Sequence, residues 1–430
     1  MTQSDHRNSL SEQFFNPLFD LYSISDHQRA CRGISDLEYL KMGVERCISQ
    51  ASSGHDFLQN FRTDDGRKVG VSHFFESIKS ERRLNHQSSM NQLMKIYLKE
   101  HIVDELGEID ELKGWHLLAG DGHYQKGAIF DHKTKADTSR KNPSKSATGH
   151  FFKIDLRTHH LGYLDLAQPE DGKKSEHDMK MLKRLDLEQL RDGAAKGIKV
   201  LTLWDRACID YPFWLKAKSQ KGVYFATMEK SNSVTKFIRE RTIIDYSDKR
   251  NEGLISDRIV ETSAGYEIRQ IIYVNPEDGV EYRYLTNEFT LPGWCIVLLY
   301  KHRWDIEKVF DELKSKLEEK RSWASSIAAK KAHGLFMCLT HNLMMLMENQ
   351  VQDIEGMEDV VEQKRKVTRA KKKIKGLRGK LTPSFINSFF SRASQRTYRF
   401  IRWLRRSIDK RLTYKESLDE LVNVWGCGIK

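Results

Sequence analysis

The sequence lacks the cysteine patterns that hold zinc or build a disulfide framework. Its six cysteines are scattered, with no Cys-x2-Cys pair and no histidine pair following one at zinc-finger spacing. Scattered cysteines, together with the absence of an amino-terminal signal segment, predict a reducing, intracellular setting, so we expect a cytoplasmic protein. Neither a structural zinc site nor a secreted, disulfide-stapled domain is expected.

Long apolar runs and proline-rich linkers are also absent. The two most apolar stretches are 291–300, which is too short to span a bilayer, and 335–347, which His341 and Asn342 interrupt. The chain has only seven prolines in 430 residues and shows no internal repeat. These absences predict no membrane partner and favour a compact chain of about two to four domains.

Acidic residues are outnumbered by basic ones. The chain has 72 Lys and Arg against 60 Asp and Glu, which gives a formal net charge of +12. Such an excess favours a polyanionic partner such as DNA. The densest basic run, 364–380, includes Lys371, Lys372 and Lys373. It predicts contacts with DNA phosphates, with a solvated linker as the alternative.

The most informative segment that is present is 300–314. On a helix with about 100° per residue, four different polar side chains fall in one stripe about 60° wide beside an apolar face: Tyr300, Arg303, Glu307 and Lys314. A carboxylate can bind a hard cation, and the basic groups can hold phosphate oxygens. On its own, such a stripe is more typical of a solvated surface with ordinary ion pairs.

The spacing Tyr-x2-Arg-x3-Glu-x6-Lys resembles the signature of bacterial DDE insertion-sequence transposases of the hairpin-forming family four. All four positions match without a gap. The resemblance implies a DNA transposase in which Glu307 is the third catalytic acid. It also implies that Tyr300, Arg303 and Lys314 hold the DNA.

Two further acids end β-rich runs. Asp121 follows the apolar run that begins at 114, and Asp205 follows the one that begins at 197, so each is predicted at or near a strand end. Asp205 and Arg206 also resemble the family's Asp-Arg signature. Alone, either aspartate could be an ordinary turn residue.

The elements between these acids have a characteristic order. Segments 149–157 and 161–167 are predicted to be paired strands, and 180–196 is predicted to be an amphipathic helix. Strand, hairpin, helix and strand, followed by a later helix with the third acid, is the order of a ribonuclease H-like fold. We therefore predict an α/β fold: a ribonuclease H-like core with a β-strand insertion and helical flanks.

Three carboxylates suit a pair of Mg²⁺ ions, which prefer oxygen ligands. Two such ions can stabilise both the attacking and the leaving oxygen of phosphodiester cleavage. Asp121 is the predicted shared ligand, Asp205 and Glu307 each take one ion, and Mn²⁺ could substitute. Three more residues are predicted to contact DNA, with a weaker basis in the sequence: His123, Lys126 and Arg206.

The chain is predicted to divide into five regions. They are a helical region at 1–110, the first part of the core at 111–230, a β-rich insertion at 231–290, the second part of the core with the Glu helix at 291–350, and a basic helical region at 351–430. The first region, with the run 74–84 that contains Arg82 and Arg83, resembles the part of the family that binds the terminal repeats of the element, and a solvated helical face is the alternative. The last region is predicted to bind DNA or to form a dimer. Relatives can carry a base-stacking tryptophan in the insertion, but 216–290 contains none. A tyrosine there could stack on a base or be an ordinary strand residue, so this role stays unassigned.

We therefore expect a DNA transposase that acts by two-metal hydrolysis, hairpin formation at the element ends and strand transfer. Its expected partners are the terminal inverted repeats, target DNA and a second copy of the chain in a synaptic complex. Two alternatives stay open. One is a metal-dependent nuclease or recombinase of the same fold that does not transpose, and the other is a catalytically silent DNA-binding regulator.

Overall fold

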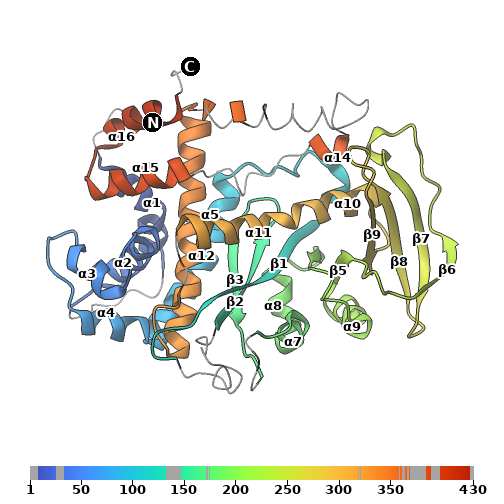
Figure 1. The fold of residues 1–430 in the computed structure, drawn as a ribbon, viewed down its shortest axis with the longest axis horizontal. Coiled ribbons are helices and arrows are strands. Elements are labelled where there is room, and N and C mark those ends of the chain that lie inside the picture. The colour runs from blue at the N-terminus through green and yellow to red at the C-terminus, as the bar shows by residue number, and fades with distance from the viewer. Residues whose placement is uncertain are drawn as a thin grey trace, which may run out of the picture.

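The computed structural model describes residues 8–25, 33–131, 147–170, 173, 175–317, 319, 321–357, 359–360, 364–365, 368, 384–388 and 398–426. Figure 1 shows a long sheet through the centre and right of the molecule, with the first and last helices together on its left. Among the described helices, none is long and apolar enough to cross a membrane.

One nine-stranded sheet organises the fold. Its strands are β1 (Trp115–Lys126), β2 (Ala147–Asp155), β3 (Leu161–Leu166), β4 (Lys199–Leu203), β5 (Val223–Met228), β6 (Thr235–Glu240), β7 (Leu254–Thr262), β8 (Glu267–Val274) and β9 (Glu281–Thr286). They are ordered β3-β2-β1-β4-β5-β9-β8-β7-β6. β2 is antiparallel to β1 and β3, whereas β1, β4 and β5 run parallel. The predicted α/β class, with a ribonuclease H-like core, is confirmed.

The strands predicted as an insertion continue the core sheet. β9 pairs with β5 at one side and with β8 at the other, and all pairings from β5 outwards to β6 are antiparallel. The inserted strands therefore extend the hydrogen-bonded ladder, and Figure 1 shows them as its right-hand end.

Both faces of the core sheet are covered. Leu117 and Leu118 follow each other on β1 but belong to different buried clusters, because successive strand residues point to opposite faces. The cluster that contains Leu118 is closed by α7 (Asp178–Arg184), α8 (Leu187–Arg191) and α9 (Tyr211–Lys221).

The prediction of a single helix at 180–196 was wrong. The chain forms α7 and α8 with a break at Leu185, because Asp186 caps α8 in a box with Gln189. Asp192 then ends α8 in the left-handed conformation. A cap inside an apolar stripe interrupts a helix that periodicity alone would continue.

The other face is covered by long helices. Bounds of the remaining helices are α1 (Leu10–Ser23), α2 (Asp36–Ile48), α3 (Gly54–Asn60), α4 (Val71–Ile78), α5 (Glu81–His101), α10 (Gly293–His302), α11 (Trp304–Asp311), α12 (Ile327–Asn349), α14 (Phe385–Ser388), α15 (Tyr398–Asp409) and α16 (Tyr414–Trp425). Short 3₁₀ turns lie at Asp110–Leu112 and Lys249–Asn251, and π turns at Glu312–Lys316 and Gln350–Ile354. α12 is buried over most of its length and packs on β3, α2 and α5.

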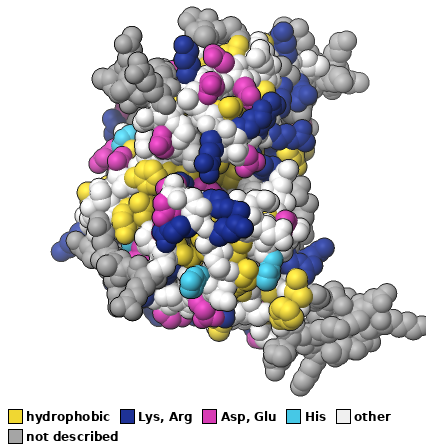
Figure 2. All heavy atoms as spheres, turned by 90° about the vertical axis from the view of Figure 1, so that its left-hand side faces the viewer, with side chains coloured by type: hydrophobic (Ala, Val, Ile, Leu, Met, Phe, Trp, Pro, Cys, Tyr) yellow, Lys and Arg dark blue, Asp and Glu magenta, His cyan; other side chains and the backbone are white. Residues whose placement is uncertain are grey.

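The two ends of the described chain pack on each other. The Leu10 N–H donates to the Leu412 carbonyl at 2.9 Å, and the Tyr414 N–H donates to the Asn8 carbonyl at 2.8 Å. Figure 2 shows this side of the molecule, where basic and acidic side chains intermingle and apolar ones lie between them. On α15, Arg402 and Arg406 are exposed.

The basic pair in the first region has a structural role. Arg82 donates two hydrogen bonds to Asp36, at 2.6 and 2.7 Å, and Arg83 lies 3.2 Å from the same carboxylate. Asp36 and Arg83 are buried, and Arg83 also lies over the Tyr39 ring. This ion cluster ties α5 to α2.

Candidate active site

Asp121 lies within β1, just beyond the end of its parallel neighbour. β4 pairs with β1 only as far as Ala119 opposite Leu203, whereas β2 follows β1 to Lys126. The Asp121 carboxylate accepts a 2.7 Å hydrogen bond from the Gly122 N–H. The aspartate is therefore held by a continuous strand but stands at the edge where β4 stops.

Asp205 comes two residues after the last residue of β4. Its carboxylate accepts a 2.7 Å hydrogen bond from the Ala207 N–H, which fixes it in a tight turn. Because β1 and β4 are parallel, their carboxyl ends point to the same edge of the sheet. Asp205 therefore lies at the same edge as Asp121, where its charge raises the pKa of Asp121.

Gly120 permits the residue before Asp205 to pack directly against the backbone of β1. A Cβ at Gly120 would overlap the indole of Trp204, the residue before Asp205. Trp204 is buried, and its Nε1–H donates to Thr202 at 2.9 Å. The indole is therefore fixed against the bare backbone of β1.

We expect Gly120→Ala to destabilise the protein by about 1–3 kcal/mol, since it overpacks a closed site. It should also lower any activity of the site, because Trp204 cannot move without displacing Asp205. Chemical unfolding and DNA cleavage would measure the two effects. The matched control is Gly70→Ala, where the nearest atom to the added Cβ is at 3.7 Å and φ is −68°. Equal stability of the two variants would contradict the expectation.

Glu307 reaches the site from α11. α10 ends at His302 and α11 begins at Trp304, with Arg303 in right-handed helical conformation between them. Arg303 donates a 2.8 Å hydrogen bond to the Glu307 carboxylate, so the i, i+4 geometry predicted for this pair is present.

Arg303 is buried beside the acids. It is only 5% exposed, and its Nε and Nη1 atoms have no hydrogen-bond partner within the described chain. Its guanidinium carbon lies 5.4 Å from the Tyr300 ring centre and 5.3 Å from that of Trp304. The two aromatic rings hold the guanidinium in place while leaving N–H donors available.

The Asp121 carboxyl is influenced by the charges of the two other predicted acids. Burial raises the pKa of the Asp121 carboxyl to about 6. The Gly122 N–H and the Arg303 charge lower that pKa, and the charges of Asp205 and Glu307 raise it. The acids are far apart in sequence, but their charges interact across the edge of the sheet.

This raised pKa gives a pH-dependent stability. The group binds its proton more tightly in the folded state, so its contribution is complete below about pH 4 and is lost as pH rises through about 6. In EDTA, Asp121→Asn should therefore gain stability relative to wild type between about pH 4 and pH 8. Thermal unfolding across this range would measure the difference. Asp419→Asn, at an exposed site on α16, is the control and should show no such trend.

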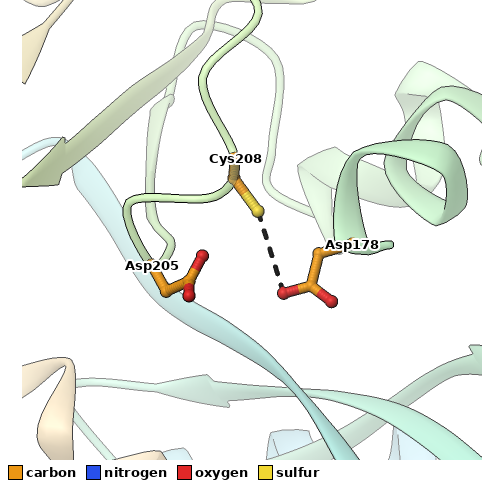
Figure 3. Close-up of side chains that lie close together, drawn as sticks. All are labelled: Asp178, Asp205 and Cys208. Atoms are coloured by element: carbon orange, nitrogen blue, oxygen red, sulfur yellow. Dashed lines mark hydrogen bonds between the residues drawn. The ribbon is translucent and has the colours of Figure 1, made fainter. Parts of the chain in front are cut away.

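A fourth carboxylate, Asp178, was missed by the sequence reasoning. It is the first residue of α7, and one ligand atom from each of Asp178, Asp205 and Cys208 lies within 4.8 Å of the others (Figure 3). The Cys208 thiol donates to Asp178 at 3.9 Å. No motif marked Asp178, because an acid in the first turn of a helix is common for reasons of helix stability alone.

Tyr300 and Lys314 do not share one side of a regular helix, as the sequence had predicted. Tyr300, on α10, is 3% exposed, and its ring centre is 5.1 Å from that of Tyr284. Its side chain therefore packs against β9. Lys314 is exposed on the π turn that follows α11. The assumption of a regular α-helix through 314 was wrong, because the wider turn shifts every residue after Asp311.

The other predicted DNA contacts have mixed settings. His123 is buried, and burial, followed by the nearby charge of Lys314, lowers its pKa to about 4. It is uncharged at neutral pH, which weakens it as a phosphate ligand. Lys126 and Arg206 are exposed. The run predicted to bind phosphate, with Lys371, Lys372 and Lys373, lies outside the described residues.

Comparison with known proteins supports the class that this site indicates. Residues 131–343 match the family model described as "Transposase DDE domain", a range that includes Asp205 and Glu307 and begins after Asp121. This part of the chain is thus similar to a transposase DDE domain. Comparison of the sequence with curated proteins gives no match.

Seven chains of solved structures match as well. One is the piggyBac transposase in a synaptic complex with hairpin DNA, at 12% sequence identity. The match covers 96% of this chain and 84% of that one, with a TM-score of 0.36. At this TM-score we base no argument on the likeness.

Proposed function

We propose that this protein is a DDE transposase of the hairpin-forming insertion-sequence type, with Asp121, Asp205 and Glu307 as its catalytic acids. The observation that carries the proposal is that the charges of Asp205 and Glu307 act on Asp121, while the buried Arg303 acts on Asp121 and pairs with Glu307. The transposase DDE domain match and the net charge of +12 support a DNA substrate.

The residues fit a divalent metal. The charges of Asp205 and Glu307 raise the pKa of Asp121, and the charges of Asp121 and Asp205 raise that of Asp178, so the edge carries more negative charge than Arg303 offsets. Carboxylate oxygens are ligands that Mg²⁺ and Mn²⁺ prefer. Asp121, Asp205 and Glu307 would hold the metal, with Asp121 shared between two ions. When bound, the ions would stabilise the charge on the attacking and leaving oxygens of phosphodiester cleavage.

The other residues of the site bind and orient the DNA in this proposal. Arg303 positions Glu307 through its 2.8 Å ion pair, and its free N–H groups can donate to phosphate oxygens. Lys314 is exposed and can contact phosphates of the same DNA strand. Lys126 and Arg206 are exposed too and would add further contacts with phosphate. The Tyr300 ring holds the Arg303 guanidinium in position through a cation–π contact.

The proposed reaction is cut-and-paste transposition. Water attacks phosphorus at the element end, and breaking the P–O3′ bond frees a 3′-hydroxyl. That hydroxyl attacks the opposite strand, which closes a hairpin and releases the flanking DNA. Reopening of the hairpin then permits joining to target DNA. Because two ends must be joined, the working form is a dimeric synapse on the terminal inverted repeats.

The test uses an end-labelled duplex that carries the DNA flanking the coding sequence. Incubation with wild-type protein and Mg²⁺ should give a band that snaps back after denaturation, and EDTA should abolish it. Only linear double-strand breaks would favour the nuclease of the same fold. Binding without cleavage would favour a silent regulator, and either result would overturn the proposal.

A further inference from the structure

Asp178 stands among the acids without a counter-charge of its own. Within the described chain it has no ion pair with Lys, Arg or His, and it accepts a weak 3.9 Å hydrogen bond from the Cys208 thiol. Its neighbours Asp121 and Asp205 are both negative. A helix-stabilising role does not require that an aspartate face two other carboxylates.

The charge of this corner favours a bound cation. Asp178 and Asp205 each place a carboxylate oxygen within 4.8 Å of the other, and Figure 3 shows both directed into the space between α7 and the turn after β4. Burial raises the pKa of Asp178 to about 7, and the charges of Asp121 and Asp205 raise it too. A divalent ion between these groups would remove the repulsion that the metal-free arrangement carries.

The unpaired donors of Arg303 indicate separately that a ligand binds near these acids. Arg303 is 5% exposed, its Nε and Nη1 atoms have no partner in the described chain, and its charge acts on Asp121. Buried donors of this kind are rarely left unpaired unless something binds them. Unpaired arginine donors near several carboxylates fit a cation that arrives with, or is joined by, an anionic phosphate.

Cys208 shapes the site without holding the ion. It is fully buried, and burial raises the pKa of its thiol well above the ordinary value, so the sulfur stays protonated. A neutral thiol is a poor ligand for Mg²⁺ but can donate to the Asp178 carboxylate. It thereby orients Asp178 toward Asp205.

We propose that Asp178 is a fourth carboxylate ligand, binding the divalent ion that Asp121 and Asp205 hold. This inference rests on the proposed function and adds to it a ligand supplied by α7. The three predicted acids come from β1, the end of β4 and α11, and Asp178 adds a carboxylate from a fourth element, the start of α7. The ion would then also connect α7 to the edge of the sheet.

The test is to titrate the full chain, without DNA, with Mn²⁺. Binding is measured as the decrease in the electron paramagnetic resonance signal of free Mn²⁺. Asp178→Asn, which keeps the side-chain shape, should weaken binding by about tenfold or more. In EDTA its melting temperature should equal or exceed that of wild type, because the repulsion among the acids is relieved. Glu188→Gln, at an exposed carboxylate on α8, is the control and should bind as wild type does.

The outcomes separate this inference from the proposed function. If Asp205→Asn loses Mn²⁺ binding while Asp178→Asn binds like wild type, the role of Asp178 is overturned and the proposed site stands. If both variants bind like wild type, the proposed metal site itself is overturned. Lower stability of Asp178→Asn in EDTA would assign Asp178 a structural role and would also overturn the inference. If Asp178→Asn does not fold, Asp178→Glu decides the matter: weaker binding supports the ligand role and unchanged binding overturns it.

Discussion

Glu307→Gln is expected to lower DNA cleavage by at least about a hundredfold while leaving DNA binding close to wild type. The amide keeps the size of the side chain and can still contact Arg303, but it removes the negative charge that a divalent ion needs. Glu307 is partly exposed, with 35% of its side chain accessible, so the exchange should cost little stability. Cleavage would be followed on a denaturing gel and binding by a mobility shift at fixed salt.

The control for Glu307→Gln is Glu188→Gln, which changes the same chemical group away from the site. It should cleave and bind like wild type. Cleavage by Glu307→Gln at the wild-type rate would remove Glu307 from the proposed set of acids. A loss of binding together with cleavage would instead assign Glu307 to the DNA-binding surface.

Asp257→Ala is expected to destabilise the protein by about 3–5 kcal/mol, because it leaves buried positive charge without its partner. Asp257 accepts two hydrogen bonds from Arg269, at 2.7 and 2.8 Å, and two from Arg241, at 2.7 and 3.0 Å. Arg269 is fully buried and also donates to Glu288 at 3.1 Å. The cluster joins β7 and β8 to the segment that leads into α10.

The position of this cluster extends its effect to the active site. Glu288 accepts a 2.9 Å hydrogen bond from the Leu291 N–H, just before α10, and α10 leads to Arg303. Loosening this link should therefore reduce cleavage as well as stability. Urea unfolding and the cleavage gel measure the two effects.

The matched control for Asp257→Ala is Glu267→Ala, in the same sheet. Glu267 forms an exposed ion pair with Arg239 at 3.3 Å, and exposed pairs contribute at most about 1 kcal/mol. A cost for Asp257→Ala as small as that of the control would mean that the cluster does not hold the inserted strands in place.

The sequence by itself determined much of the core and one helix of the site. The apolar runs before Asp121 and Asp205 predicted two strands, and both form, because a buried strand needs only a short run of apolar residues. The spacing of Arg303 and Glu307 predicted contact between them, because residues four apart on a helix are neighbours. Both predictions depend on local geometry, which the order of residues fixes.

Only the tertiary structure decided what meets at the edge of the sheet. Asp178 joins the acids because α7 packs beside the turn after β4, and no local pattern encodes that approach. The break between α7 and α8 likewise depends on a cap that overrides the apolar stripe. The π turn places Lys314 away from its predicted helical position.

Burial is the second property that only the folded chain decides. Arg82 and Arg83 lie in the region predicted to bind the terminal repeats, but both pair with Asp36, because ion pairing offsets the cost of burying a charge. His123 follows Asp121 closely, yet packing against Phe310 buries it and keeps it neutral. Charge in a sequence shows which residues can bind phosphate, and packing decides which of them are free to do so.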